Sequence, residues 1–173
     1  MLIKHSKIKD ADLVEGHEHI LLSLQLEKLS DYPADLGLPS PHFIVFLAMD
    51  ATSVDEHDIL EFASRALSQG AVYFCTWGPD CERVHDLIDQ ACNQRIPDPT
   101  VETVIMTTWH VDEELADAVW FSIYSTCPAE TYIESCWAAL FITVTSPTWA
   151  KQIGEWLSAP ELLNQQLGLS DEP

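Results

Sequence analysis

Two segments of the chain repeat one pattern that ends in a residue able to do chemistry. "AVYFCTWGPD" (71–80) and "TVIMTTWHVD" (103–112) each lead from apolar and β-branched residues into Thr-Trp. An aspartate follows each tryptophan by three positions, Asp80 in the first segment and Asp112 in the second. The apolar stretches are typical of strands, so both aspartates are predicted just beyond a strand end.

Asp50 completes a possible set of three carboxylates, because it ends the apolar stretch "HFIVFLAMD" (42–50) in the same way. Carboxylate oxygens are ligands of Mg²⁺, with water filling the remaining positions. Asp50, Asp80 and Asp112 are therefore candidate metal ligands, provided that their strands are neighbours. No cofactor is expected, although Mg²⁺ is possible at these carboxylates.

His110 and two tryptophans add to this set. His110 stands between Trp109 and Asp112, where a histidine could act as a general base. Trp77 and Trp109 both end predicted strands, so we expect both rings near the same edge of the sheet. The candidate rim site consists of Asp50, Trp77, Asp80, Trp109, His110 and Asp112. Two further histidines, His57 and His85, fall among carboxylates on the polar faces of predicted helices, where we expect solvated side chains.

Strand-like and helix-like segments alternate through most of the chain. Apolar runs predict strands, and apolar residues at helical spacing follow each run. The strands are expected at 42–50, 71–77, 103–109 and 136–145, and the helices at 54–69, 79–95, 111–125 and from Ser146 onward. This order predicts an α/β fold, a three-layer α/β/α sandwich with a mostly parallel sheet of four strands, Rossmann-like or flavodoxin-like. Right-handed crossovers would then gather the carboxyl ends of the strands at one edge.

The N-terminal part of the chain is harder to interpret. "HEHILLSLQLEKL" (17–29) alternates in a way that suits a fifth, edge strand, although Leu22, Leu26 and Leu29 would also share a helix face. We expect a strand. The predicted organisation is an N-terminal extension packed on the domain (1–40), an α/β core (41–158) and a C-terminal helix or tail (159–173).

Acidic residues are placed at the predicted helix starts. Ser53 with Glu56 fits a capping box, and Gly78-Pro79 fits an N-cap followed by proline. Carboxylates in a first helical turn offset the positive end of the helix dipole and contribute about 0.3–1 kcal/mol each. They also occupy the place where a phosphate would bind. No GxGxxG or GxxxxGK[ST] pattern is present, so nucleotide binding is disfavoured.

The charge of the chain restricts its partners. The formal net charge is −20, and residues 29–150 hold three arginines against 19 carboxylates, a net charge of −16. Such a field repels nucleic acids and anionic membranes and attracts basic proteins. We therefore expect a basic protein partner and no direct nucleic-acid binding.

Other properties of the sequence indicate where the protein works. No apolar run reaches the roughly 18 residues of a membrane span. The first ten residues carry lysines without a following apolar run, so no signal peptide is expected. Five cysteines without CxxC spacing favour a reduced, cytoplasmic protein.

A second candidate surface lies on the predicted third helix. Trp120, Phe121 and Tyr124 widen its apolar face beyond what packing on a sheet requires. We expect the N-terminal segment to cover this face. The alternative is a docking face for a partner or for a second copy of the chain, because exposed Trp and Tyr anchor many interfaces.

The sequence contains no assembled catalytic set. The leading hypothesis is a non-enzymatic protein-binding or inhibitory accessory protein, immunity or antitoxin-like, for a basic partner. The alternative is a metal-dependent enzyme of hydrolase or phosphoryl-transfer type, with its acidic site at the carboxyl edge of the sheet.

Overall fold

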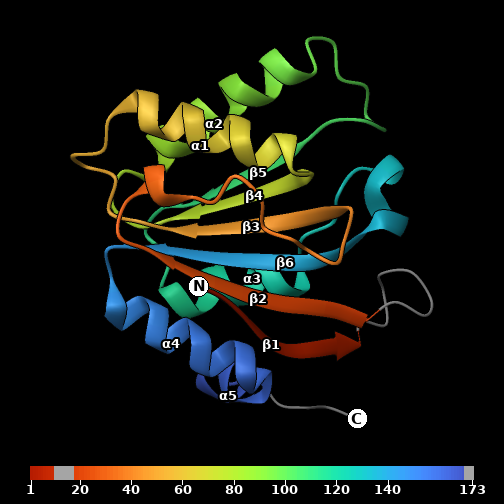
Figure 1. Ribbon diagram of the computed structural model, residues 1–173. Helices are drawn as coiled ribbons and strands as arrows, with labels where there is room; N and C mark the ends of the chain where they lie inside the picture. The colour runs from red at the N-terminus through yellow and green to blue at the C-terminus, as the bar shows by residue number, and fades with distance from the viewer. Residues whose placement is uncertain (10–17, 170–173) are drawn as a thin grey trace.

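A six-stranded sheet with the order β1-β2-β6-β3-β4-β5 forms the middle layer of the computed structural model, which describes residues 1–9 and 18–169 (Figure 1). Five strands run parallel, and β1 runs antiparallel to its neighbour β2. Across the sheet the strands are β1 (Leu2–Lys9), β2 (Glu18–Leu26), β6 (Cys136–Val144), β3 (His42–Ala48), β4 (Ala71–Trp77) and β5 (Met106–His110).

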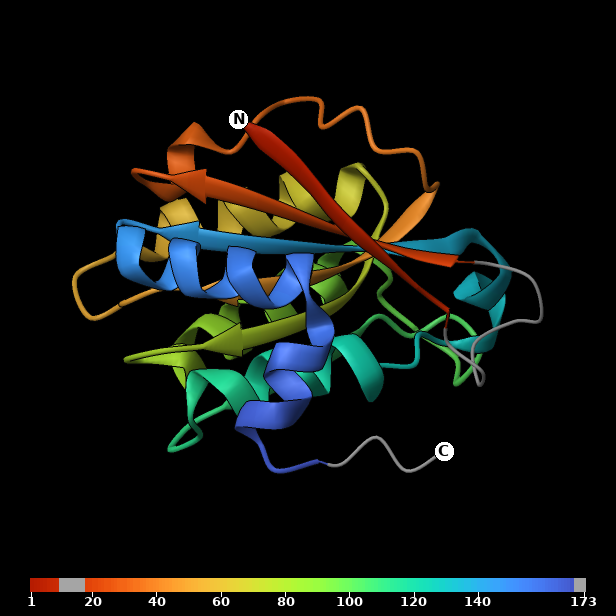
Figure 2. The same cartoon turned by 90° about the horizontal axis from the view of Figure 1, so that it is seen from below.

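Helices cover both faces of this sheet (Figures 1 and 2). One face carries α1 (Glu56–Ser68), α2 (Cys81–Arg95) and the short 3₁₀ helix η1 (Leu29–Asp31). The other carries α3 (Leu115–Tyr124), α4 (Pro147–Ser158) and α5 (Pro160–Gln166), and a second 3₁₀ helix, η2 (Glu130–Ser135), leads into β6. The predicted three-layer α/β/α sandwich is confirmed.

The strands are apolar without interruption because both of their faces are buried. In β3, Phe43, Val45 and Leu47 pack under α1 and α2, whereas Ile44 and Phe46 pack toward α3 and α4. All five of these side chains are at most 1 % exposed. The sheet therefore separates two apolar cores, one on each side.

The N-terminal segment belongs to the sheet. The strand expected within 17–29 is confirmed as β2, but it is an inner strand between β1 and β6 and not the edge. The edge strand is β1, which the sequence did not reveal because its letters "LIKHSKIK" are largely polar. Lysines are common on exposed sheet edges, where they discourage pairing with other chains.

Several element boundaries differ from those expected. The third predicted strand, 103–109, begins only at Met106, because the Val104 amide donates to the Thr100 carbonyl in a preceding turn. The helix expected over 111–125 begins at Leu115. The C-terminal segment forms α5, and residues 170–173 of the expected tail lie outside the described residues. Among the described residues, no helix has the length and apolarity needed to cross a bilayer.

Candidate functional site

The carboxyl ends of the five parallel strands lie at one edge of the sheet, as the order of elements predicted. We call this edge, with the loops 49–55, 78–80, 111–114 and 145–146, the carboxyl rim. Three of its residues have left-handed backbone without being glycine: Asp80 (φ 66°), Asp112 (φ 61°) and Thr145 (φ 59°). Each follows a strand directly or within a few residues and turns the chain toward the next helix.

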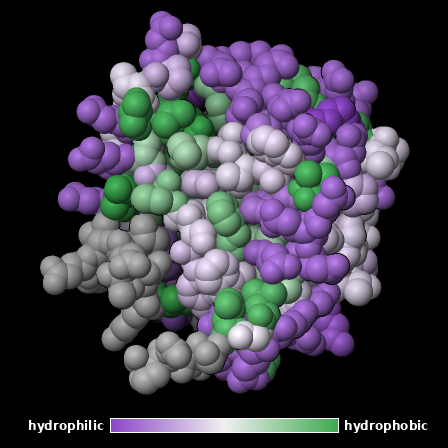
Figure 3. All heavy atoms as spheres, turned by 180° about the vertical axis from the view of Figure 1, so that it is seen from behind, coloured by the Kyte–Doolittle hydropathy of each residue, from purple (hydrophilic) through white to green (hydrophobic). Residues whose placement is uncertain are grey.

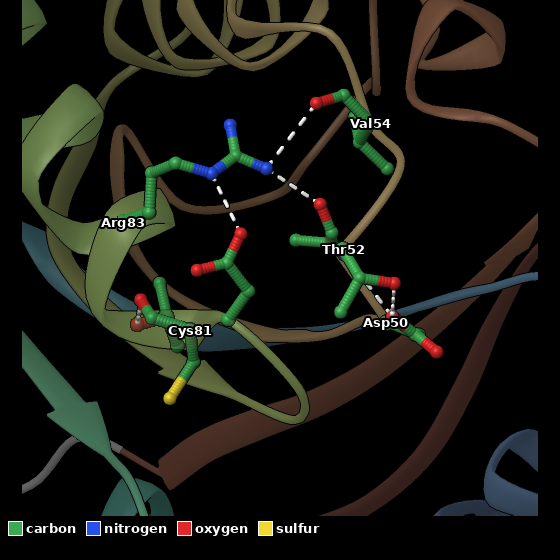
Figure 4. A network of polar contacts seen from close by, with 8 residues as sticks. Asp50, Thr52, Val54, Cys81 and Arg83 are labelled. Carbon is green, nitrogen blue, oxygen red and sulfur yellow. Dashed lines mark hydrogen bonds and ion pairs between the residues drawn. The ribbon is translucent and has the colours of Figure 1, made fainter.

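Arg83 joins two of these loops, a role that no sequence pattern indicated (Figure 4). Its Nε donates to Oδ2 of Asp80 at 2.6 Å. Its Nη2 donates to the carbonyl oxygens of Ala51 and of Val54, the latter at 3.2 Å. One guanidinium therefore neutralises Asp80 and holds the loop after β3 against the loop after β4.

Asp50 is exposed and bonded within its own loop. Its Oδ1 accepts from the Thr52 amide at 3.1 Å and from the Thr52 hydroxyl at 2.7 Å. These hydrogen bonds lower the pKa of Asp50, because they stabilise its charged form. In Figure 4 Asp50 lies on the far side of the loop from Arg83.

The three aspartates do not form a cluster. Asp50 is bonded to Thr52, Asp80 is paired with Arg83, and Asp112 is an exposed residue of the loop after β5. Within residues 1–9 and 18–169, no three His, Cys, Asp or Glu side chains are grouped so that they could hold a metal ion. The geometry thus gives no support to the candidate metal site.

The two tryptophans of the repeated pattern point to opposite faces of the sheet. In the pairing of β4 with β5, Trp77 lies opposite His110, and Trp109 lies opposite Thr76. Because side chains alternate along a strand, an offset of one residue places the two rings on different faces. Both residues lie at the rim, as expected, but their rings lie on opposite faces of the sheet.

On the α3 face, Trp77 and His110 are held by Glu113. The Trp77 indole Nε1 donates to the Glu113 carbonyl at 2.9 Å, and its ring packs edge-on against Trp149 at 5.0 Å. Nδ1 of His110 lies 2.8 Å from Oε2 of Glu113, and its Nε2 lies 3.2 Å from the Thr108 hydroxyl. His110 is only 5 % exposed, and its contacts tie the loop after β5 to the strand.

On the other face, β5 and α2 share a polar cluster that we call the β5–α2 cluster: His85, Asp86, Asp89, Thr107 and Trp109. Nε2 of His85 lies 3.0 Å from the Thr107 hydroxyl, which donates to Oδ1 of Asp89 at 2.6 Å. Nδ1 of His85 lies 3.1 Å from Oδ1 of Asp86. The Trp109 ring lies over His85, with 4.5 Å between ring centroids.

His85 was expected to be solvated, and this was wrong: it is 8 % exposed, because Trp109 covers it. The sequence held a signal that could have found the cluster. Thr107 and Trp109 occupy alternate positions of one strand and so share a face, and α2 packs against that face.

The proposed docking face on α3 is half-buried. The Trp120 indole donates to Asn164 Oδ1 of α5 at 3.1 Å, and Phe121 packs on His110 with centroids 4.8 Å apart. Tyr124 packs beside Trp120, with centroids 5.4 Å apart. Helix α5 therefore covers part of this face, and the expectation that the N-terminal segment also covers it stays a prediction.

Trp109 is the exception among the six tryptophans, all of which lie in the described ranges. It is 44 % exposed, while the other five are buried or half-buried. Seen from behind, the molecule carries apolar side chains in small separate groups among hydrophilic ones (Figure 3). On this face the exposed apolar surface is therefore divided into small groups.

The helix starts are acidic, as expected, although the capping residues differ. Asp55, not Ser53, caps α1 by accepting from the His57 amide at 2.8 Å. α2 begins after Asp80 instead of at Gly78-Pro79. Acidic residues lie in the first turns of α1, α2 and α3, so these positive helix ends already face negative charge.

Fold and rim together define an acidic α/β/α domain with an exposed indole at one sheet edge. Residues 21–160, from β2 to the first residue of α5, match a family described as Domain of unknown function (DUF7684). The match covers well over half of the chain, which therefore belongs to this family. No curated protein and no solved structure matches the chain.

Proposed function

We propose that this protein is a non-enzymatic, protein-binding domain that acts in the cytoplasm on a basic protein partner. The observation that carries this proposal is the exposed Trp109 ring among carboxylates. The side chains of Asp86 and Asp89 are 71 % and 43 % exposed beside it. An exposed aromatic ring that is flanked by carboxylates is suited to a protein–protein interface.

The negative charge and the Trp109 ring would contribute differently to binding. The sequence has no lysine or arginine between Arg95 and Lys151, so β5 and the loop that follows it carry no cation of their own. A surface with an excess of negative charge raises the association rate of a basic partner, while an aromatic ring buried on binding supplies affinity. This division supports an inhibitory accessory role, immunity or antitoxin-like, in which the acidic domain covers a basic surface.

The alternative, a metal-dependent hydrolase or phosphoryl-transfer enzyme, requires Asp50, Asp80 and Asp112 to converge. Each has a separate environment, and Asp80 is already paired with Arg83. A Mg²⁺ or Mn²⁺ titration followed by thermal unfolding tests this alternative, because a cation bound to the native state raises its stability. We expect no shift of the unfolding temperature at millimolar metal, and a saturable rise would favour the enzyme.

Salt-dependent capture tests the binding proposal. The tagged protein and its Trp109→Ala variant are incubated with lysate at low ionic strength and at about 1 M salt, where the Debye length is about 3 Å. We expect a basic protein that binds the wild type at low salt, is released at high salt and binds the variant weakly. Trp120→Ala serves as the control, because that indole is bonded to α5. A partner whose binding changes neither with salt nor with Trp109→Ala would contradict the proposal.

A further inference from the structure

β5 forms one edge of the sheet and, among the described strands, pairs only with β4. The outer side of such a strand presents backbone N–H and C=O groups that a further strand can use. Many peptide-binding domains bind extended segments in this way, through main-chain hydrogen bonds and side-chain pockets.

The two edges of the sheet differ in how they are protected. β1 carries Lys4 and Lys7 at the opposite edge, and its His5 and Ser6 are bonded to α4. β5 has the sequence "MTTWH", with no lysine, no carboxylate and no proline. Its edge therefore lacks the charges that usually prevent strand addition.

Exposed apolar side chains accompany this edge. Met106 is 36 % exposed, Trp109 44 % and Val111, just after the strand, 52 %. Thr107 and Trp109 face the α2 side, and Met106 and Thr108 face the α3 side. A strand placed beside β5 would thus meet an exposed apolar side chain on each face.

A hollow of about 270 Å³ opens beside β5 on the α2 side. Its walls are mostly apolar, formed in part by Cys92, Ile96 and Ile105, and its polar lining includes Asp89 and Thr107. Lys and Arg side chains can lay their apolar stems along apolar surface while the charged group stays in a polar environment. The apolar walls of this hollow suit the stem of such a side chain, and the Asp89 carboxylate suits its charged group.

The carboxylates near β5 indicate which kind of chain could bind at this edge. Asp86 and Asp89 flank β5 on α2, and Asp112, Glu113 and Glu114 follow its last residue. A second copy would bring the same carboxylates face to face, which costs energy. A basic segment would instead neutralise them.

We propose that β5 binds an extended basic segment of a protein partner by strand addition. One Lys or Arg of the segment enters the hollow against Asp89, and another lies on the Trp109 ring in a cation–π contact. This inference rests on the proposed function, and it adds the form of the partner and the residues that recognise it.

The experiment uses a synthetic peptide of about eight residues, a usual strand length, that alternates Lys or Arg with Val or Thr. Binding to the isotope-labelled full chain is followed by NMR. We expect shifts and slower hydrogen exchange at the backbone amides of β5. The same peptide with alternate amides N-methylated, which removes donors and keeps the charge, is expected to bind at least about tenfold more weakly.

Three variants identify the contacts. Asp89→Asn and Trp109→Ala are each expected to weaken peptide binding about five- to tenfold, with folding verified by circular dichroism. Met106→Lys places a cation on the edge and should weaken binding even if the two others perturb α2. Glu155→Gln removes an exposed carboxylate from α4, whose pairing with Lys151 is at 3.8 Å, and should change binding less than twofold.

The outcomes separate this inference from the proposed function. Salt-sensitive binding that shifts α3 or α4 and leaves β5 unchanged would overturn strand addition while leaving a basic partner in place. Equal binding of the N-methylated peptide would overturn it as well. Failure to bind any basic peptide would count against both. A concentration-dependent doubling of mass that protects β5 would assign the edge to a second copy instead.

Discussion

Trp77 of β4 lies opposite His110 of β5, one residue out of step with Trp109, which lies opposite Thr76. Two segments with the same sequence pattern therefore place their indole rings in different surroundings. Trp77 is enclosed by Trp149 and Glu113, and Trp109 stands partly in solvent over His85. The Trp77 ring is therefore enclosed by neighbouring side chains, and the Trp109 ring is partly exposed.

The first prediction compares these two indoles. Trp77→Ala is expected to lower the free energy of unfolding by about 2–4 kcal/mol, because it leaves a cavity beside Trp149. Trp109→Ala should cost about 1 kcal/mol or less, since much of that ring is already exposed. Urea unfolding of both variants measures the difference. Equal losses would mean that the two rings are equally enclosed.

The second prediction concerns Gly78 at the rim. Its φ is 113°, and a Cβ there would overlap the carbonyl oxygen of Met49. Gly78→Ala should therefore destabilise the protein by more than about 2 kcal/mol. Gly37→Ala is the matched control, because Gly37 also has a positive φ, 59°, but has nothing near its Cβ position. It should cost about 1 kcal/mol. Thermal or urea unfolding distinguishes the clash from the backbone strain.

The third prediction separates the two roles of Arg83. Asp80→Asn removes the ion pair and keeps the carbonyl bonds to the loop after β3, so it should cost less than about 1 kcal/mol. Arg83→Met also removes the bonds to the Ala51 and Val54 carbonyls and should cost about 2 kcal/mol. Unfolding of the two single variants and the double variant measures the coupling. Identical losses would show that the carbonyl bonds contribute nothing.

The fourth prediction is a pH dependence at β1. His5 lies between the hydroxyls of Ser23 and Ser158, at 2.7 and 2.9 Å, and burial lowers its pKa from the ordinary value of 6.5. A lowered pKa means that the unfolded state takes up the proton first. The contribution of His5 to stability is thus fully present above about pH 6.5 and is lost as the pH falls through its folded-state pKa.

Hydrogen-exchange protection of the β1 amides measures this effect. Protection should fall between neutral and mildly acidic pH in the wild type, and the fall should be smaller in His5→Gln. The exposed His57 on α1 offers the control, since His57→Gln should leave the pH response of β1 unchanged. A response of β1 that survives His5→Gln would assign it to other groups.

The fifth prediction concerns Thr145, a β-branched residue with a φ of 59°. Such residues are strained in this conformation, and glycine is not. Thr145→Gly should raise the free energy of unfolding by about 1 kcal/mol. Thr143→Gly, two residues earlier inside β6, should lower it, because that side chain is 3 % exposed and packed. Failure of Thr145→Gly to stabilise the protein would indicate that the turn is not strained.

Much of the fold could be predicted because the relevant signals are local. Buried strands such as 71–77, and the helix apolar positions Ile59, Phe62, Ala63, Ala66 and Leu67, follow from periodicity alone. β1 was missed because its lysines and other polar residues interrupt the apolar pattern that marks a strand. Strand order was also out of reach, because it depends on pairing between distant segments.

The candidate site was predictable in position but not in arrangement. Asp50, Asp80 and Asp112 each follow a strand, and the strands are parallel. Their position near the carboxyl rim could therefore be predicted. Which face a side chain takes depends on inter-strand register, and a shift of one residue reverses it. For that reason the sequence could not show that Trp109 covers His85, or that Arg83 would neutralise Asp80.

The position of β6 has a consequence for how the chain folds. β6 lies between β2 and β3, so residues 136–144 join an N-terminal pair of strands to a three-stranded unit made from the middle of the chain. Until β6 is in place, these two units have no strand in common. Closing contacts between segments more than a hundred residues apart is entropically costly, and such topologies fold slowly. During synthesis the edges of β2 and β3 therefore stay unpaired until β6, the last strand of the described residues, has been made. Exposed apolar strands make this interval prone to aggregation.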